Sequence, residues 1–431
     1  MPGTYGGSAV APSSRRWWGV ARENQVGVAT LPTNTVPVDA KSLAPEDHPK
    51  YLPDDAIRAQ MAMTYNQILG PEDATFSFGG PNFLDVHGFF LDCLLGDLSS
   101  TGSTPANGTS LGGSVATLAI GGTQATIVSA TGYASASTVQ IDTGSVAEIV
   151  VLSTAPAGTL ITFGNDPLRF PHASGATVTT VSSPFTHVFG LLNSTLGYGG
   201  IAGAQPPTLT LTDATNLNYS GSPGTNTSGA RAYASACVSD ITFTGNAEQL
   251  LDIKVTGSSW VSAPASAAPT NTISSVIPVA NWRAGVYIGG TAASNLVPQI
   301  GEWALTVKRQ LQVYFTVQNS ANPYVIARGP LSASFSLKYT APYDESALAA
   351  LLYLGYQWIH IVLDNGLSGT SHIRLTIDGN TGQATKSKPG SSSVLIDFDN
   401  TFDMVANSTN VGGSGGLSPI IISLLNAVAT Y

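Results

Sequence analysis

Two stretches of the chain, ALTVKRQLQVYFTV at 304–317 and LSASFSLKYT at 331–340, decide its fold class. In the first stretch the polar side chains of Lys308, Gln310 and Gln312 alternate with a mostly apolar set. Successive side chains of a β-strand point to opposite faces of the sheet. The two stretches therefore predict neighbouring antiparallel strands that have one apolar face and one wet face.

The same alternation extends to both sides of these stretches. It is present in PTLTLTDA, SDITFTGN, LLDIKVTGSSW and GVYIGG upstream, and in QWIHIVLD and SHIRLTIDG downstream. Helical patterns are few: we expect helices over 54–69, over 82–95 with Asn82 as N-cap, and over 344–355 between Asp344 and Gly355. The predicted fold class is mainly β with a few helices, an antiparallel β-sandwich core packed with an α-helix.

Changes in composition along the chain suggest five segments. Residues 97–183 consist of short alternating runs separated by Gly, Ser and Thr, which predicts a small inserted all-β domain, the accessory domain. The predicted boundaries are an extended N-terminal arm at 1–50, the start of the core domain with short helices at 51–96, the inserted β-sandwich accessory domain at 97–183, the β-sandwich core with helix 344–355 at 184–411, and a C-terminal tail at 412–431.

The low content of charged residues points to assembly. Charged residues make up 10% of the chain, against about 25% in ordinary globular proteins, so a surface hidden against other copies is favoured over a Ser/Thr-rich secreted surface. The net charge is −9 and basic residues cluster only at Arg15–Arg16, which argues against gripping DNA by its phosphates. The adjacent Trp17 and Trp18 are expected to bury against a neighbouring subunit rather than to stack on sugars or bases.

The cysteines and the apolar runs limit the setting. Cys93 and Cys237 stand in apolar surroundings without a CxxC spacing, so we expect two small buried hydrophobic residues rather than a metal or redox site. The N-terminus has no long apolar run of the kind found in a signal peptide, and no stretch approaches the roughly 18 apolar residues of a membrane span. We expect synthesis in a cytoplasm and no membrane insertion.

Side chains capable of chemistry are present, but their spacing favours structural roles. His360 and His372 could face each other across a hairpin, where a contact between strands is favoured over a zinc site that lacks a third ligand. Asp397 and Asp399 share one strand face, as a glycosidase pair or a calcium site could, although a solvated or channel-facing strand is favoured. The sequence GYGGIAG at 197–203 favours a flexible loop over a phosphate loop. No catalytic, cofactor-binding or metal-binding residue is predicted.

The order of these elements resembles a known family. The quoted segments are FSFGGPNFLDVHGFFLDCLLGD, NPYVIARGPLSASFSLKY, DESALAALLYLGY, QWIHIVLDN, SHIRLTIDG and the ending VLIDFDNTFDMVANS to SPIIISLLNAVATY. This series is similar to the major tail tube proteins of long-tailed bacteriophages. The resemblance covers residues 72–96 and 184–431, whereas 97–183 resembles small β-modules added to phage tail and baseplate proteins.

The resemblance implies a structural virion protein of the phage tail, assembled in the cytoplasm of the host bacterium, that is not an enzyme and needs no cofactor. Its partners would be copies of itself in stacked rings, six per ring favoured and three as the alternative. The tape measure protein and the phage DNA would occupy the lumen without specific recognition. Asp364 and Asp378 are the candidate acids that line the lumen.

Two other functions stay open at this stage. One is a virion surface or secreted adhesion protein whose 97–183 domain binds host carbohydrate, and the other is a carbohydrate-active enzyme that uses Asp397 or Asp399. In a tube, the accessory domain is expected on the outer surface, because an inward domain would block the channel.

Overall fold

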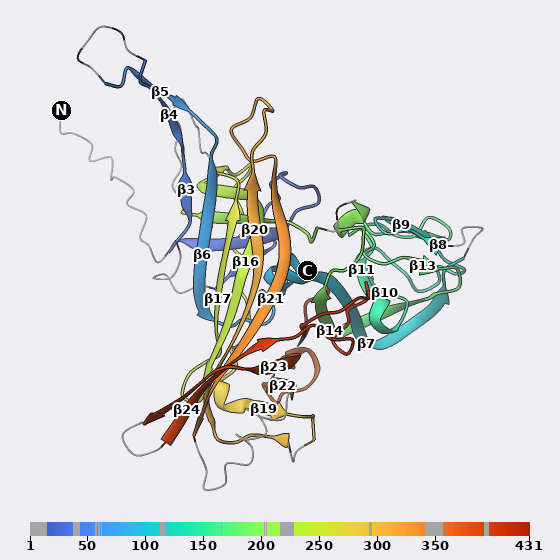
Figure 1. The fold of residues 1–431 in the computed structure, drawn as a ribbon. Helices are drawn as coiled ribbons and strands as arrows, with labels where there is room; N and C mark the ends of the chain where they lie inside the picture. The colour runs from blue at the N-terminus through green and yellow to red at the C-terminus, as the bar shows by residue number, and fades with distance from the viewer. Residues whose placement is uncertain are drawn as a thin grey trace, which may run out of the picture.

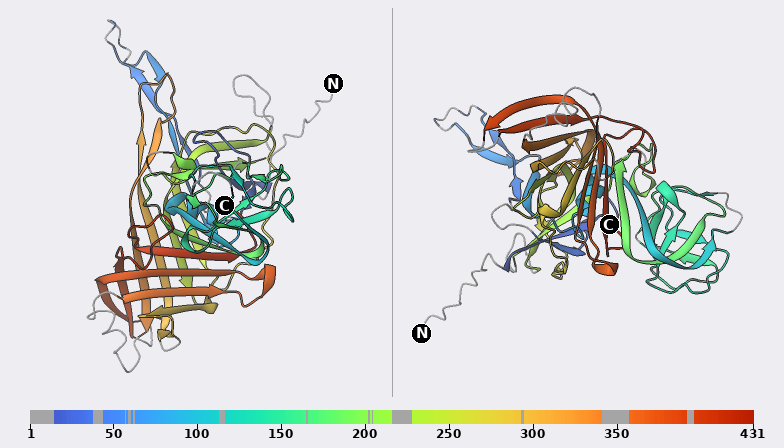
Figure 2. Two further views of the ribbon diagram at one scale, coloured as in Figure 1. Left: turned by 90° about the vertical axis from the view of Figure 1, so that its right-hand side faces the viewer. Right: turned by 90° about the horizontal axis from the view of Figure 1, so that it is seen from below.

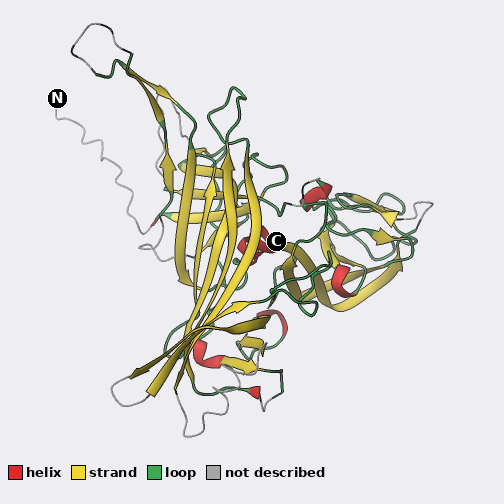
Figure 3. Cartoon of the chain, in the orientation of Figure 1, coloured by secondary structure: helices red, strands yellow, loops and turns green. Residues whose placement is uncertain are grey.

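Antiparallel β-strands make up most of the protein in this computed structural model, and helices are few (Figures 1 and 3). This confirms the predicted mainly-β fold class. The structure describes residues 15–37, 44–56, 58, 61, 63–112, 117–164, 166–201, 203, 205–215, 228–292, 295–340, 357–391 and 396–431. The predicted helix over 344–355 lies outside these residues.

One long twisted sheet forms the body of the molecule. Its strands, in spatial order, are β3 (Glu46–His48), β6 (Asp73–Pro81), β17 (Asp252–Ser259), β16 (Ala230–Asn246), β20 (Ile300–Tyr314), β21 (Val325–Thr340), β24 (Ile396–Met404), β23 (Arg374–Ser391), β22 (Gln357–Asp364) and β19 (Ala284–Ile288). All neighbours in this series are antiparallel. The later strands run across the lower ends of the long ones (Figures 1 and 2), as the twist of a large sheet requires.

The stretches 304–317 and 331–340 lie in the central pair β20 and β21, which are antiparallel as predicted. One face of this pair is apolar: Leu305, Val307, Phe335 and Leu337 are buried. They join the large hydrophobic core beneath the sheet, together with Phe243 of β16. In these long alternating runs, every second side chain therefore packs against this core.

Further strands branch from the body sheet. The first half of β16 pairs with β15 (Leu209–Ala214) and touches β18 (Ala263–Pro264), and β15 continues to β1 (Trp17–Arg22) and β2 (Asn34–Val36). On the other side, β23 pairs with β25 (Ile420–Asn426), β25 with β14 (Thr177–Leu191), and β14 with β7 (Gly96–Ser110). The strands β7 and β14 thus lead from the body into the accessory domain (Figure 1).

The accessory domain has a hydrophobic core of its own. Leu111, Ile127, Val139, Phe163 and Val178 belong to a cluster that is separate from the core of the body. Its other strands are β8 (Thr117–Leu118), β9 (Gln124–Thr126), β10 (Thr138–Ile141), β11 (Glu148–Val151), β12 (Leu160–Thr162) and β13 (His172–Ala173). Figure 1 shows this domain beside the body, on the side away from β3 and β6.

The one α-helix among the described residues, α1 (Gly88–Leu95), is shorter than the predicted helix over 82–95. Its N-cap residue is His87, not Asn82, whose side-chain oxygen lies 2.5 Å from His87 Nδ1. All residues of α1 are buried, as its dense apolar sequence suggested. Gly96, with φ +86°, ends the helix in the left-handed conformation that glycine tolerates best.

The predicted helix over 54–69 is wrong for the described residues of that stretch. Residues at its two ends form a β-hairpin, in which β4 (Tyr51–Asp54) pairs with β5 (Asn66–Leu69). This hairpin projects beyond the body sheet (Figures 1 and 2), and Ile68 and Leu69 are exposed. Most helix stability in proteins comes from packing an apolar face, and the described residues bury neither Ile68 nor Leu69.

The chain termini are also built into the sheets more than predicted. Trp18 of β1 is fully buried within the same chain and needs no neighbouring subunit, and the described part of the N-terminal arm contributes the strands β1, β2 and β3 to the sheets. The C-terminal tail likewise contributes β25, a strand between β14 and β23 whose Ile420 and Ile422 are fully buried. Both termini form strands because strand formation buries their apolar side chains.

Candidate functional site

The side of the body sheet away from the core carries mainly hydroxyl groups and paired charges, and we call it the polar sheet face. Opposed residues of antiparallel strands lie on one face, so the strand register defines its rows. One row is Ser77, Thr256, Asp240, Lys308 and Ser332, and the next is Lys254, Thr242, Thr306, Ser334 and Asp403. The face therefore spans six strands, from β6 to β24.

Contacts along these rows join neighbouring strands. Thr256 donates a 3.0 Å hydrogen bond to Asp240 Oδ2, and Lys308 Nζ lies 4.0 Å from Asp240 Oδ1. The hydroxyls of Thr242 and Thr306 are 3.2 Å apart. The two rows together carry two lysines, Lys254 and Lys308, and two acids, Asp240 and Asp403, so their charges balance and the rows hold no cationic cluster. Such a surface is wet and offers little to hold a phosphate backbone.

Large apolar side chains are exposed at one end of the body sheet, which we call the apolar end. It consists of Tyr51, Leu52, Ile68 and Leu69 of the β4–β5 hairpin and Tyr314, Val317 and Tyr324 around the β20–β21 connection. Leu52 is 47% and Ile68 59% exposed, although they are neighbours in the hairpin register. A backbone hydrogen bond from Glu72 to Ala321 joins the two parts. At the opposite end of the sheet, Trp282 and Leu367 are also exposed.

A buried ion pair joins the accessory domain to the body. Arg169 of the accessory domain makes two 2.8 Å hydrogen bonds to the carboxylate of Asp92 on α1. The side chain of Asp92 is 2% exposed and that of Arg169 is 11% exposed. A bidentate pair fixes both distance and orientation, so this contact sets how the accessory domain sits on the helix.

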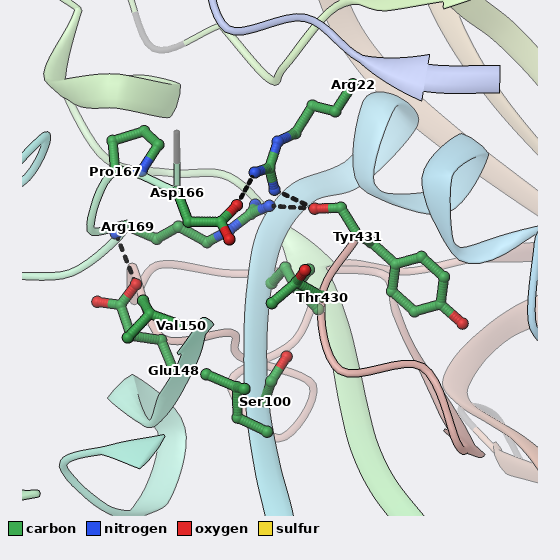
Figure 4. A pocket seen from close by; sticks show the side chains of 11 residues that line it. Arg22, Ser100, Glu148, Val150, Asp166, Pro167, Arg169, Thr430 and Tyr431 are labelled. Carbon is green, nitrogen blue, oxygen red and sulfur yellow. Dashed lines mark hydrogen bonds and ion pairs between the residues drawn. The ribbon is translucent and has the colours of Figure 1, made fainter. Parts of the chain in front are cut away.

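A second arginine extends this junction (Figure 4). Arg22 of β1 donates to Asp166 of the accessory domain and to the backbone carbonyl of Tyr431. The Tyr198 ring lies near both guanidinium groups, whose carbons are 4.9 Å (Arg22) and 5.0 Å (Arg169) from its centroid. The cavity at this point has a volume of only about 20 Å³, which is room for about one water molecule. The junction is therefore a structural clamp and has no room for an organic substrate.

Each of the two predicted lumen acids is bonded to a histidine. Asp378 lies opposite His360 in the β22–β23 register, and the carboxylate is 2.6 Å from His360 Nδ1. Asp364 accepts from His372 Nε2 at 2.9 Å. The expected contact between the two histidines is therefore wrong, because each pairs with an acid instead.

The surroundings shift the pKa values of these two acids in opposite directions. Burial raises the pKa of Asp378, and the His360 hydrogen bond only partly opposes it. Burial would also raise the pKa of Asp364, but hydrogen bonds from His372 and the Gly366 amide hold it below its ordinary value. Both acids are partly buried, so their carboxylates serve first as partners within the β22–β23 hairpin.

The other residues considered for catalysis or metal binding also make contacts between strands. Asp397 accepts a 3.1 Å hydrogen bond from Thr340 Oγ1, and Lys338 is opposite Asp399. A buried Ser–His pair exists, in which Ser100 Oγ is 2.8 Å from His187 Nδ1, but His187 Nε2 donates to the carbonyl of Val428 at 2.7 Å. The described residues hold no group of three or more His, Cys, Asp or Glu side chains suited to a metal ion.

Sequence reasoning missed the junction residues, and it read Tyr198 only as part of a loop. Arg22, Asp92 and Arg169 are far apart in the chain, and no spacing marks them as partners. The available signal was compositional: in a chain so poor in charge, an acid within the apolar run 82–95 requires a buried partner.

No protein-family model matches the chain, and no curated protein is significantly similar to it in sequence. None of the helices in the described part of the chain has the length and apolar character needed to cross a bilayer.

Proposed function

We propose that this protein is a structural subunit that assembles with copies of itself into stacked rings around a channel, as the tail tube proteins of long-tailed phages do. The apolar end carries the proposal. A projecting hairpin with Leu52, Ile68 and Leu69 exposed is costly for an isolated molecule. A second copy that covers the hairpin would remove this apolar surface from water.

The two ends of the sheet support stacking in one direction. The apolar end lies at one extreme of the long strands, and Trp282 and Leu367 lie at the other. Contact between unlike ends leaves a free end of each kind after every addition, which is the geometry of an open-ended stack.

The polar sheet face is the wall that we propose for the channel. Its hydroxyl rows and matched charges would stay hydrated and would not retain DNA phosphates. Asp364 and Asp378 are each held by a histidine, and Asp240 on this face is likewise held by Thr256 and Lys308.

The carbohydrate-binding alternative receives less support from the described part of the accessory domain. Sugar-binding surfaces commonly present exposed aromatic rings, but Tyr133 is buried and its hydroxyl donates to the carbonyls of Asn107 and Val178. Among the described residues of this domain, the large apolar side chains that are exposed are the aliphatic Val128 and Leu160.

Electron microscopy of the purified full chain tests the proposal. We expect hollow tubes of stacked rings from the natural sequence, and isolated subunits when Leu52, Ile68 and Leu69 are all replaced by Ser. A matched control replaces Val128 and Ile277, which are also exposed, by Ser and should still form tubes. Circular dichroism should show the same strand content in all three proteins.

Two outcomes count against parts of this proposal. A natural chain that sediments as a monomer at every concentration would refute self-assembly. Tubes formed by the Leu52, Ile68 and Leu69 variant would instead remove the hairpin from the interface and leave self-assembly standing.

A further inference from the structure

A cavity of about 230 Å³ lies next to the junction, between the accessory domain and the body. Its wall includes Asp97, Leu98, Ile120, Phe170, Leu192 and Tyr198. Water occupies about 30 Å³ per molecule in the liquid, so this volume corresponds to roughly eight waters. It is ten times larger than the cavity within the clamp and suits a small organic molecule.

Two buried polar atoms in this wall lack partners. Asp97 is 2% exposed, and its Oδ2 accepts hydrogen bonds from the Ser414 amide (2.8 Å) and hydroxyl (2.7 Å). Among the described residues no group donates to Asp97 Oδ1, and the buried hydroxyl of Tyr198 is also without a partner. Buried polar atoms are nearly always hydrogen-bonded in folded proteins, so these two atoms mark a place where a ligand would bind.

The charge at Asp97 indicates what kind of ligand fits. Arg169 also lines the cavity, but its guanidinium is engaged by both carboxylate oxygens of Asp92. Burial raises the pKa of Asp97, although the Ser414 hydrogen bonds and the charge of Arg169 oppose this effect. A cation that donates to Oδ1 would stabilise the ionised carboxylate.

The rest of the wall excludes a metal ion as the preferred cation. Calcium takes six to eight oxygen ligands, and magnesium keeps several of its waters in an octahedral shell, so both ions need a polar, hydrated site. Leu98, Ile120, Phe170 and Leu192 instead give the cavity a largely apolar lining. Sites of this kind bind molecules with an apolar body and one or two polar groups.

We propose that this cavity binds a short primary alkylammonium ion. Its ammonium group donates to Asp97 Oδ1, its alkyl chain packs against Leu98, Phe170 and Leu192, and the Tyr198 hydroxyl remains available to a second polar group of the ligand. The site involves both the accessory domain and the body, so an occupied site also strengthens their junction. This inference does not depend on assembly into tubes.

Isothermal titration calorimetry of the full chain with n-butylammonium chloride tests the site, with n-butanol as the uncharged probe of similar size. We expect saturable one-to-one binding of the ammonium and at least tenfold weaker binding of the alcohol. Asp97→Asn should weaken ammonium binding at least tenfold. The control Asp403→Asn changes an acid on the polar sheet face and should leave the affinity unchanged.

A second variant keeps the test decisive if Asp97→Asn fails to fold. Leu196 is on the rim of the cavity and is 37% exposed, so Leu196→Trp can narrow the entrance with little effect on the core. It should weaken binding severalfold. Equal affinity for the two probes, unchanged affinity in Asp97→Asn or Leu196→Trp, or no measurable heat with n-butylammonium would each overturn the proposal.

Discussion

His172 in β13 is a buried histidine between two acids. Its Nε2 is 2.6 Å from Glu148 Oε1, and its Nδ1 is 3.2 Å from Asp142 Oδ2. Burial alone lowers the pKa of His172, but the hydrogen bonds and charges of Glu148 and Asp142 outweigh it and leave the pKa raised. The protonated imidazole therefore links β13 to Glu148, the first residue of β11, and to Asp142 in the connection that precedes β11.

This raised pKa predicts that the accessory domain loses stability as the pH rises. An unfolded histidine has a pKa of about 6.5. The contribution of His172 should be complete below that value and lost as the pH passes the higher pKa of the folded state. Hydrogen exchange of accessory-domain amides from pH 5 to 9 would measure this loss, and His172→Gln should remove the pH dependence. Equal slopes in both proteins would show that His172 does not titrate as argued.

At the scale of single residues, the sequence identified the titratable groups but not their partners. His360 and His372 were correctly placed near one hairpin, and the register then set Asp378 opposite His360. A one-residue difference in register changes every cross-strand pair. Spacing alone could not decide between a histidine pair and two His–Asp pairs.

The helix α1 is held by two buried arginines at its C-terminal end. Arg309 Nη1 donates to the carbonyl of Leu94 at 2.7 Å, and Arg328 Nη1 donates to those of Pro207 at 2.9 Å and Cys93 at 3.5 Å. The last carbonyls of a helix lack partners within it, and cations stabilise that end. Burial and the nearby charge of Arg328 lower the pKa of Arg309 to about 10. Two cations thus take the place of a polar cap.

Arg309→Met should destabilise the protein, because it leaves the buried carbonyl of Leu94 without a donor. A lost partner of this kind costs about 1–3 kcal/mol. The neighbouring Lys308 is also a long cationic side chain but points to the polar sheet face, so Lys308→Met should change stability by less than about 0.5 kcal/mol. Urea unfolding followed by tryptophan fluorescence measures both. Equal effects at the two positions would contradict the proposed role of Arg309.

At the scale of elements, alternation was a better guide than helical periodicity. The strands β20, β21, β22 and β23 bury every second side chain over much of their length, and their pairing was predicted. The segment 54–69 has helical composition, but Ile68 and Leu69 stay exposed in the described part of the chain. Tertiary packing, which decides such cases, is not visible in a local pattern.

The relation between the accessory domain and the body depends on the pair of Arg169 and Asp92. Loss of one partner leaves an uncompensated buried charge, which costs about 3–5 kcal/mol. Arg169→Met should therefore loosen the accessory domain, seen as a larger radius in small-angle X-ray scattering and faster proteolysis near α1. Arg283→Met changes an exposed arginine and is the control. Because burial of an apolar pair is tolerated, Asp92→Leu in the Arg169→Met background should restore much of the loss.

At the scale of the whole molecule, the sequence predicted an inserted all-β domain at 97–183 but not the contacts that join it to the body. Its own core, around Phe163 and Val178, agrees with a separate folding unit. Two features instead tie this domain to the body: the continuous strands β7 and β14, and the ion pair of Arg169 with Asp92. Partners that lie far apart in the chain, such as Asp92 and Arg169, become neighbours only once both domains have folded.

The position of β25 determines the order in which the body can be completed during synthesis. Its residues Ile420–Asn426 pair with β14 on one side and β23 on the other, so both neighbours leave the ribosome before the strand that separates them. The accessory domain, whose core spans residues 111–178, has all of its core residues long before that moment. The edges of β14 and β23 that pair with β25 therefore stay unpaired in the nascent chain. This part of the sheet forms only after β25 has been synthesised.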